Sequence, residues 1–255
     1  MKLTVGYFYK DLLNLYGDNG NIEALMYRSK KRGIDFDIIE IGLGTEVDRN
    51  LLKKIDVVFM GGGPDSAQKS LYKDLVENKS GFLRDYIEGR GMGLYICGAY
   101  QLLGKYYKAA DGNILKGLGI FDLYTEHVGD QRKRCVGNTI VKLNTKIVED
   151  LYFKSVCGKF SNLITGFENH GGRTYLGETQ EPLGFIKKGN GNNSKDGTEG
   201  IIYKNSIGTY FHGPFLVRNP HMADYIIAKS LNLDTIKPLD DYLTYSAYTA
   251  SLKLK

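Results

Sequence analysis

The chain has 255 residues, of which 42% are hydrophobic and 25% charged, a composition that favours an ordinary globular protein over a disordered or fibrous one. Its 34 basic and 29 acidic side chains give a net charge of +5, but the basic residues are scattered and no nucleic-acid reader motif is present, which argues against a nucleic-acid partner. No apolar run reaches the ~18 residues of a membrane span, no leader is recognisable, and three distant cysteines predict neither disulfides nor a metal site, so we expect a cytosolic protein.

The first hundred residues alternate between strand-like and helix-like patterns. Strands are predicted at residues 3–9, 36–41, 56–60 and 94–96, and helices at residues 19–32, 66–78, 81–89 and 98–107. The turn at residues 17–19, which contains Asp18, is able to cap the first of these helices. Alternation of this kind is typical of a parallel sheet with helices on both faces.

From about residue 117 the pattern changes to short strands separated by Gly/Asn turns. They are predicted at residues 139–143, 163–167, 183–187, 200–203 and 208–211, and a helix follows at residues 220–231. The Gly/Asn-rich stretch 189–200 is most simply a hairpin loop. No linker or repeat is evident, so we predict a single domain over residues 1–255, with residues 237–255 as a C-terminal helical extension. Tyrosines at three-residue spacing in that extension are expected to pack on the domain itself, with docking of a partner as the alternative.

Cys97 ends an apolar strand and is followed at once by two small residues, Gly98 and Ala99, that open a helix. A cysteine on such a turn points its sulfur at the ligand-binding edge of a doubly wound sheet. The helix N-terminus favours the thiolate, which is the nucleophilic form. A buried core cysteine is the competing interpretation.

A cysteine nucleophile needs a base, and the chain has four histidines. His212 and His170 each end a strand-like run just before glycines, so the residues alone divide this role evenly between them. Three glycines at residues 61–63 follow another strand without the Gly-Lys-Ser/Thr of a phosphate loop. One of their N–H groups, together with that of Gly98, could form an oxyanion hole, although the glycines taken alone are better explained by a tight turn.

Five collinear motifs resemble the class I (triad-type) glutamine amidotransferases, and within them the CobB/CobQ-type branch. They are NLYGDNGN at 14–21, FMGGGPD at 59–65, ICGAYQLLG at 96–104, GFENHGGRT at 166–174 and GTYFHGP at 208–214. The match spans about residues 5–225. It implies an α/β fold with a flavodoxin-like, doubly wound, mostly parallel sheet and added β-hairpins in the second half of the chain.

The resemblance also implies the site residues. Cys97 would be the nucleophile and His212 its base, and Gly62, Gly63 and Gly98 would form the oxyanion hole. The substrate would be held by two further residues, Gln101 one turn into the following helix and Arg134 at a position where this branch has an arginine near the glutamine. A guanidinium suits an α-carboxylate, although a surface charge is the simpler explanation of Arg134.

Two positions depart from the family pattern. Tyr95 stands two residues before the cysteine, where a small residue is usual. Pro214 stands two residues after His212, where the third triad member is commonly a glutamate. Glu168 or another carboxylate of this chain could replace it, or a partner subunit could supply one. We prefer the partner, because an acid supplied in trans would couple hydrolysis to assembly.

Within the branch the motifs are most similar to the glutaminase subunits of two-subunit lipid II-amidating enzymes. This implies that L-glutamine is hydrolysed through a Cys97 thioester. The ammonia would pass to a Mur-ligase-like partner in a heterodimer, which amidates D-glutamate of lipid II to D-isoglutamine in peptidoglycan synthesis. The chain has no recognisable nucleotide site, so ATP and Mg²⁺ are expected in the partner and no cofactor in this chain. Two alternatives stay open, an ammonia-supplying subunit for a cobyrinate-like acceptor and a non-catalytic regulatory module.

Overall fold

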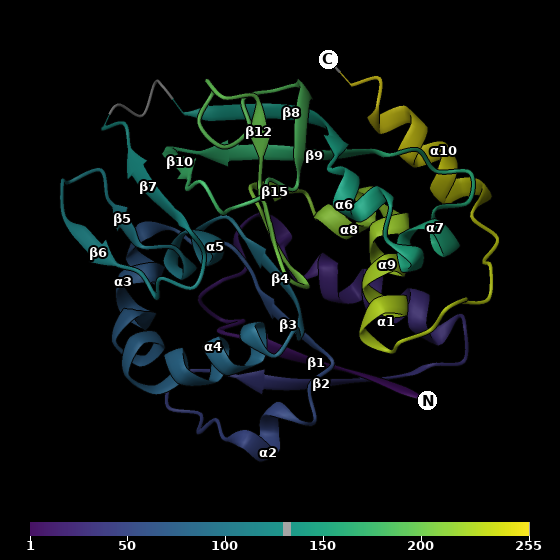
Figure 1. Cartoon of the computed structure of the whole chain (residues 1–255), viewed down its shortest axis with the longest axis horizontal. Helices are drawn as coiled ribbons and strands as arrows, with labels where there is room; N and C mark the ends of the chain where they lie inside the picture. Colours follow the sequence, from purple (N-terminus) through teal and green to yellow (C-terminus); the bar gives the residue numbers. More distant parts are fainter. Residues whose placement is uncertain (130–133, 255) are drawn as a thin grey trace.

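The computed structural model describes residues 1–129 and 134–254 (Figure 1). Its central sheet has six strands in the order β13-β14-β4-β3-β1-β2. Their bounds are β1 Lys2–Phe8, β2 Asp35–Ile41, β3 Val57–Met60, β4 Met92–Ile96, β13 Ile201–Tyr203 and β14 Ser206–Thr209. All pairs except β13–β14 are parallel. Starting from β2, the parallel strands follow the flavodoxin order 2-1-3-4-5 with β14 as the fifth, so the predicted fold class is confirmed.

The sequence of each central strand explains its position. β3 (VVFM) and β4 (MGLYI) are buried at every residue, as expected for parallel strands covered on both faces. The edge strand β2 (DFDIIEI) is largely exposed and carries three acidic residues. Tyr95, which departs from the family pattern, is buried in β4 beside Gly93, where a side chain would lie 2.5 Å from the tyrosine ring. The glycine thus makes room for the ring.

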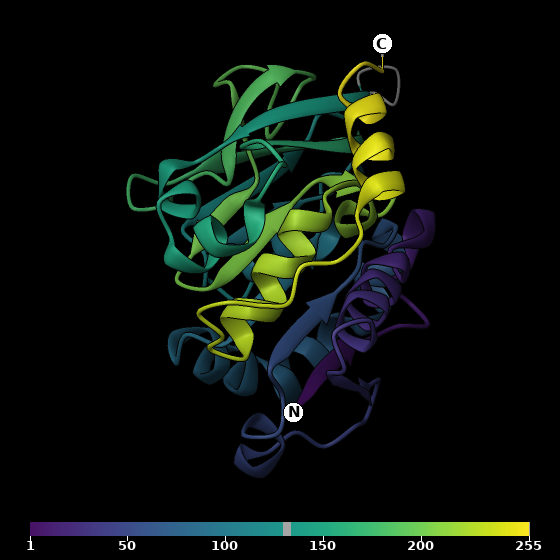
Figure 2. The same ribbon diagram turned by 90° about the vertical axis from the view of Figure 1, so that its right-hand side faces the viewer.

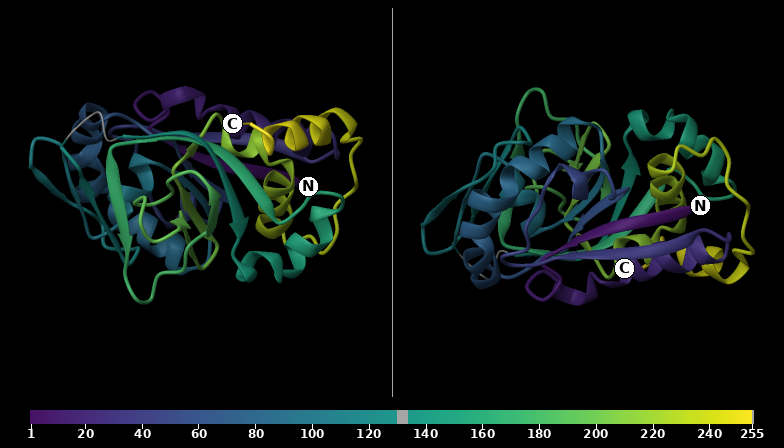
Figure 3. Two further views of the ribbon diagram at one scale, coloured as in Figure 1. Left: turned by 90° about the horizontal axis from the view of Figure 1, so that it is seen from above. Right: turned by 90° about the horizontal axis from the view of Figure 1, so that it is seen from below.

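Helices cover both faces of this sheet (Figure 3). On one face lies α1 (Gly20–Lys30), against which α8 (Phe215–Arg218) and α9 (Pro220–Ser230) pack. On the other face lie α3 (Asp65–Asp74) and α4 (Ser80–Glu88), and the short α2 (Arg49–Leu52) contacts α4. The two helices predicted for this second face form one run, because a π-helical turn, η2 (Leu75–Lys79), joins them.

The second half of the chain adds two sheets. One has the order β10-β7-β5-β6 and the other β12-β11-β8-β9-β15. Their bounds are β5 Tyr106–Lys108, β6 Ile114–Lys116, β7 Leu123–His127, β8 Cys135–Leu143, β9 Leu163–His170, β10 Gly172–Leu176, β11 Gly184–Lys188, β12 Thr198–Glu199 and β15 Phe211–His212. The loop between β11 and β12 joins antiparallel strands, as the hairpin prediction required.

Several short strands and helices of this half were not predicted from the sequence. These are the first sheet's four strands and the helices α6 (Thr145–Val148) and α7 (Leu151–Cys157). The helix predicted over residues 98–107 was also too long, because α5 (Gly98–Leu103) ends before Gly104, whose backbone is extended. The chain then enters β5, which pairs with β6 and β7.

The C-terminal extension folds back as α10 (Tyr242–Ser251), along the edge of the molecule (Figure 2). Tyr248 is buried, its hydroxyl donates to the Leu163 carbonyl at 2.8 Å, and its ring packs edge-on against Phe160. Tyr242, by contrast, is 72% exposed. The last residue of the predicted extension, Lys255, lies outside the described residues. No helix in the described part of the chain is both long and apolar enough to cross a bilayer.

Candidate active site

The residues predicted to carry chemistry lie at one edge of the central sheet. Cys97 follows β4 directly, the glycines 61–63 follow β3, and His212 lies just beyond β14. Asp18 lies beyond β1, in the short connection before α1. Because β14, β4, β3 and β1 are parallel neighbours, their carboxyl ends meet where the strand order reverses, which is where doubly wound sheets bind ligands.

The sharp turn expected at Cys97 is present. Its backbone has φ +50° and ψ −112°, a conformation that non-glycine residues rarely adopt, and its N–H donates to the Thr209 carbonyl at 2.8 Å. Gly98 allows the turn to close, since a Cβ there would lie 2.6 Å from Gln68 Nε2. The Cys97 side chain is 8% exposed and lines a cavity, so the thiol can be reached by a small substrate.

His212 is held by a buried carboxylate of this same chain. Its Nδ1 lies 3.0 Å from Asp18 Oδ1, and neither side chain is exposed. A carboxylate can only accept this bond, so Nδ1 carries the proton. Burial opposes a charged imidazole, but the hydrogen bond to Asp18 and the negative charges of Asp18 and Cys97 raise the pKa of His212 to about 10. The arrangement favours the protonated imidazole next to Cys97.

Gly62 is the point at which these three side chains meet. A Cβ on Gly62 would lie 2.8 Å from His212 Cε1, 3.1 Å from Cys97 Cβ and 3.2 Å from Asp18 Oδ2. No side chain fits in that space. The geometry therefore brings Cys97, His212 and a carboxylate together from three different strands.

The position of Asp18 differs from two expectations drawn from the sequence, one about the cap of α1 and one about the orienting acid. We expected the turn around Asp18 to cap α1, but α1 has no side-chain cap and the carboxylate faces His212 instead. We also preferred an orienting acid from a partner, with Glu168 as the named alternative in this chain. Glu168 instead accepts hydrogen bonds from Asn190 and the Gly191 N–H. The acid that contacts His212 is therefore neither Glu168 nor a residue of a partner but Asp18 of this chain. The position of Asp18 inside the motif at residues 14–21 was the one sequence feature that pointed to it.

The three predicted oxyanion donors differ in whether their N–H groups already make a hydrogen bond. The Gly62 N–H already donates to Asp18 Oδ2 at 2.7 Å, so its predicted role in an oxyanion hole was wrong. The Gly62 carbonyl accepts from the Leu15 N–H at 3.0 Å, which orients the following peptide and points the Gly63 N–H away from Leu15. The Gly98 N–H opens α5, where helices leave donors without intrahelical partners. Gly63 and Gly98 therefore keep N–H groups suited to this role.

The cavity above Cys97 has a volume of about 370 Å³, and Gln101 and Arg134 both line it. Gln101 donates from Nε2 to the Tyr210 hydroxyl at 2.7 Å. Arg134 donates from Nε and Nη2 to the Asn169 side chain at 3.1 and 2.9 Å, and Nη2 also reaches the Asn169 carbonyl at 2.9 Å. Both predicted substrate-binding residues thus lie in the same cavity as the thiol, in orientations set by neighbouring side chains.

His170, the other candidate base, also lies in this cavity wall but has a different environment. Its ring stacks on Tyr210 with centroids 3.5 Å apart, and its Nδ1 lies 2.8 Å from the Gly172 carbonyl. Burial lowers its pKa to about 3, so the ring is neutral. The structure therefore brings His212, and not His170, to Asp18 and Cys97.

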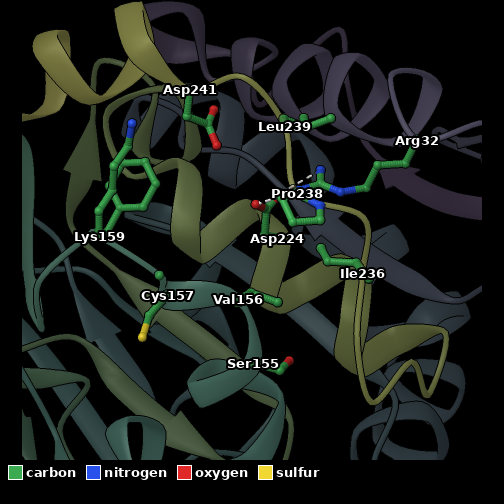
Figure 4. A pocket seen from close by; sticks show the side chains of 12 residues that line it. Arg32, Ser155, Val156, Cys157, Lys159, Asp224, Ile236, Pro238, Leu239 and Asp241 are labelled. Carbon is green, nitrogen blue, oxygen red and sulfur yellow. Dashed lines mark hydrogen bonds and ion pairs between the residues drawn. The ribbon is translucent and has the colours of Figure 1, made fainter.

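A second cavity of about 310 Å³ lies apart from this edge, between α7 and the segment that precedes α10 (Figure 4). Its buried charges are already paired, since Arg28 and Arg32 donate to Asp224 and Arg28 also donates to Asp241. The other charge in its lining is that of Lys159, an exposed residue whose ammonium lies over the Tyr245 ring. The described residues contain no cluster of His, Cys, Asp and Glu able to hold a metal ion.

Known proteins are similar to this chain in sequence. Residues 4–220 match the family of the CobB/CobQ-like glutamine amidotransferase domain. The chain is 42% identical over 229 residues to subunit GatD of the glutamine-hydrolysing lipid II isoglutaminyl synthase of Staphylococcus aureus, covering 90% of this chain and 84% of that protein. It is 37% identical to the corresponding subunit of Streptococcus pneumoniae, covering 90% and 81%. A probable cobyric acid synthase of Methanothermobacter thermautotrophicus is 32% identical over 160 residues, covering 59% of this chain and 29% of that protein.

Solved structures agree on the fold. A glutamine amidotransferase from Thermotoga maritima matches with a TM-score of 0.55 at 15% identity, covering 98% of this chain and 90% of that one. PurLQS of the same organism matches with a TM-score of 0.54 at 13% identity, covering 91% of this chain and 99% of that one. Together with the family match over most of its length, these findings show that the chain belongs to the CobB/CobQ-like glutamine amidotransferases.

Proposed function

We propose that this chain is the glutaminase subunit of an enzyme that amidates the D-glutamate of lipid II to D-isoglutamine. The observation that carries the chemistry is the meeting of Asp18, His212 and Cys97 around Gly62, at the base of a cavity that also holds Arg134. The acceptor is proposed from the similarity to two GatD subunits, each over 90% of this chain.

The reaction begins when the Cys97 thiolate attacks the carboxamide carbon of L-glutamine. The Gly63 and Gly98 N–H groups stabilise the resulting oxyanion, and the His212 imidazolium gives its proton to the leaving nitrogen. Ammonia departs and a thioester remains on the sulfur. His212, now neutral, takes a proton from water as the water attacks the thioester, which releases glutamate and restores the thiolate–imidazolium pair.

Asp18 acts on this reaction through His212. By accepting a hydrogen bond from the Nδ1 N–H, it keeps Nε2 directed toward Cys97 and stabilises the imidazolium. The acid does not need to take up a proton itself.

Amidation of a carboxylate requires activation, which ATP and Mg²⁺ supply in ligases. The sequence has no Gly-Lys-Ser/Thr triplet, and we therefore assign nucleotide binding to a Mur-ligase-like partner in a heterodimer. The assembly would act in the cytoplasm and meet the membrane only through lipid II. The similarity to cobyric acid synthases supports the second candidate, an ammonia supply for a cobyrinate-like carboxylate.

The test measures ammonia and glutamate release by the chain, with and without the candidate synthetase. Wild type is expected to release both, Cys97→Ala neither, and Cys157→Ala, which changes a cysteine outside the cavity, the same amounts as wild type. Labelling by 6-diazo-5-oxo-L-norleucine should fall on Cys97 alone. Absence of release and labelling in the complex would identify a non-catalytic module, and co-purification with a different synthetase would favour the second candidate.

A further inference from the structure

The cavity above Cys97 carries two full charges of opposite sign. Among the described residues that line it, Asp65 is the acidic side chain and Arg134 the one with a permanent positive charge. A ligand with a single charge would leave one of them unmatched. A free amino acid carries both an ammonium and a carboxylate, so it matches the pair.

The Asp65 carboxylate is oriented by its place in the fold and by one hydrogen bond. It is the first residue of α3, directly after the glycine loop, where the helix N-terminus stabilises a carboxylate. Its Oδ1 accepts the Tyr107 hydroxyl at 3.0 Å, which fixes the side chain and leaves the other oxygen available. Burial, and after it the charge of Asp65, raise the pKa of Tyr107, so this hydroxyl remains a neutral donor.

Asp65 and Arg134 both act on a third residue of the cavity wall. Both are close enough to His127, another lining residue, to influence it electrostatically. Burial lowers the pKa of His127, the charge of Asp65 opposes this, and the charges of Arg134 and Arg173 add to it. Because both groups line one cavity of about 370 Å³, a single small ligand with an ammonium and a carboxylate can contact both of them.

We infer that Asp65 binds the α-ammonium group of L-glutamine while Arg134 binds its α-carboxylate, so that the cavity selects the free amino acid. This inference rests on the proposed glutaminase function and adds a specificity-determining residue to it. The side chain of glutamine then extends toward Cys97 with its carboxamide first. Glutaramate, which lacks the amino group, and peptide-linked glutamine, whose two poles are neutral amides, are discriminated against.

The experiment compares L-glutamine with glutaramate as substrates of whichever sample, chain or complex, hydrolyses glutamine. A charge-assisted hydrogen bond contributes about 1.5–3 kcal/mol, so Asp65→Asn should raise the KM for glutamine about 10- to 100-fold. The turnover number should change much less, because this end of the substrate does not react. For glutaramate, wild type and Asp65→Asn should have the same kcat/KM within about twofold.

Asp111→Asn is the matched control, since Asp111 pairs with Lys69 on the surface and does not line the cavity. It should leave both substrates unaffected. A merely structural role for Asp65 would lower kcat/KM for both substrates by the same factor, and that result would overturn the inference. Failure of wild type to hydrolyse glutamine in any sample would instead reject the proposed function.

Alkylation of Cys97 gives a second readout that requires no turnover. Asp65→Asn should slow labelling by 6-diazo-5-oxo-L-norleucine, which carries both amino-acid charges. Its effect on labelling by iodoacetamide, which carries neither, should be small. Equal slowing of both reagents would again contradict the inference.

Discussion

Asp18 makes two bonds that serve different parts of the site. Oδ1 accepts from the His212 imidazole and Oδ2 from the Gly62 N–H. One carboxylate therefore sets the orientation of the base and the conformation of the loop that leads to Gly63. Because Asp18 already orients the imidazole, the site does not need a carboxylate at Pro214, two residues after the histidine.

We predict that Asp18→Asn reduces glutamine hydrolysis by between about 10- and 10³-fold. An amide has one accepting oxygen and no charge, so it cannot satisfy both His212 and the Gly62 N–H. The pKa of His212, raised to about 10 in the wild type, should fall, and the imidazole should lose its proton at a lower pH. An NMR titration of the imidazole measures this shift. Asp37→Asn, which removes an exposed carboxylate, should leave the titration unchanged.

Gly62→Ala should abolish most of the activity while leaving much of the fold intact. The added methyl group would come within 2.8 Å of the His212 ring and push it away from Cys97. The matched control is Gly81→Ala in α4, where no atom lies within 4 Å of the new Cβ. That variant should keep full activity and gain up to about 1 kcal/mol in the free energy of unfolding. Steady-state kinetics and urea unfolding of the two variants provide the comparison.

At the scale of elements, α10 presents one face to the domain and one to solvent. Tyr248→Ala should lower the free energy of unfolding by about 3 kcal/mol, because it leaves a cavity beside Phe160 and removes a bond to Leu163. Tyr242→Ala on the exposed face of the same helix should change it by less than about 0.5 kcal/mol. Equal effects of the two variants in urea unfolding would mean that α10 does not pack as observed.

His221 in α9 lies beneath α10, stacked on Phe160 at 5.2 Å and edge-on to Tyr248 at 5.3 Å. Burial, with a further contribution from the charge of Arg28, lowers its pKa to about 3. The unfolded chain binds this proton near pH 6.5 and the folded one does not, so stability must fall as the pH drops from about 6.5 toward 3. His221→Phe should therefore flatten the dependence of unfolding free energy on pH in this window. An unchanged slope between pH 7 and pH 5 would contradict the assignment.

At the scale of the whole molecule, a buried ion cluster joins the two ends of the chain. Asp224 in α9 accepts from Arg32 (Figure 4) and from Arg28, both near the N-terminus. Asp241 before α10 also accepts from Arg28. All four side chains are nearly inaccessible. The cluster therefore fastens α1, α9 and the C-terminal segment into one unit.

Asp224→Ala should cost about 3–5 kcal/mol of unfolding free energy, since it leaves the buried Arg32 guanidinium without a carboxylate partner and Arg28 with Asp241 alone. Asp111→Ala breaks an exposed pair with Lys69 and should have no measurable effect. Denaturant unfolding of both variants tests this, and a small effect at Asp224 would show that water reaches the cluster.

The sequence by itself was sufficient for the central sheet and for the position of Cys97. Buried parallel strands are continuous apolar runs, and a strand that ends in Cys-Gly-Ala must turn sharply into a helix, so both follow from neighbouring residues. The short strands around Tyr106 and Tyr124 were missed because each is stabilised by pairing with distant segments, which a local pattern does not record.

Only the tertiary structure decided which side chains, far apart in the sequence, lie together in the site. Asp18 and His212 are 194 positions apart and come together because β1 and β14 lie on either side of β3 and β4. This strand order places Asp18, and not Glu168, beside the base, and it makes His212, and not His170, the histidine near Cys97. It also places the Gly62 N–H in a hydrogen bond with Asp18, where the sequence had predicted a contact with an oxyanion. The physical reason is that local sequence determines backbone conformation, whereas hydrogen bonds between loops depend on the spatial order of the strands in the sheet.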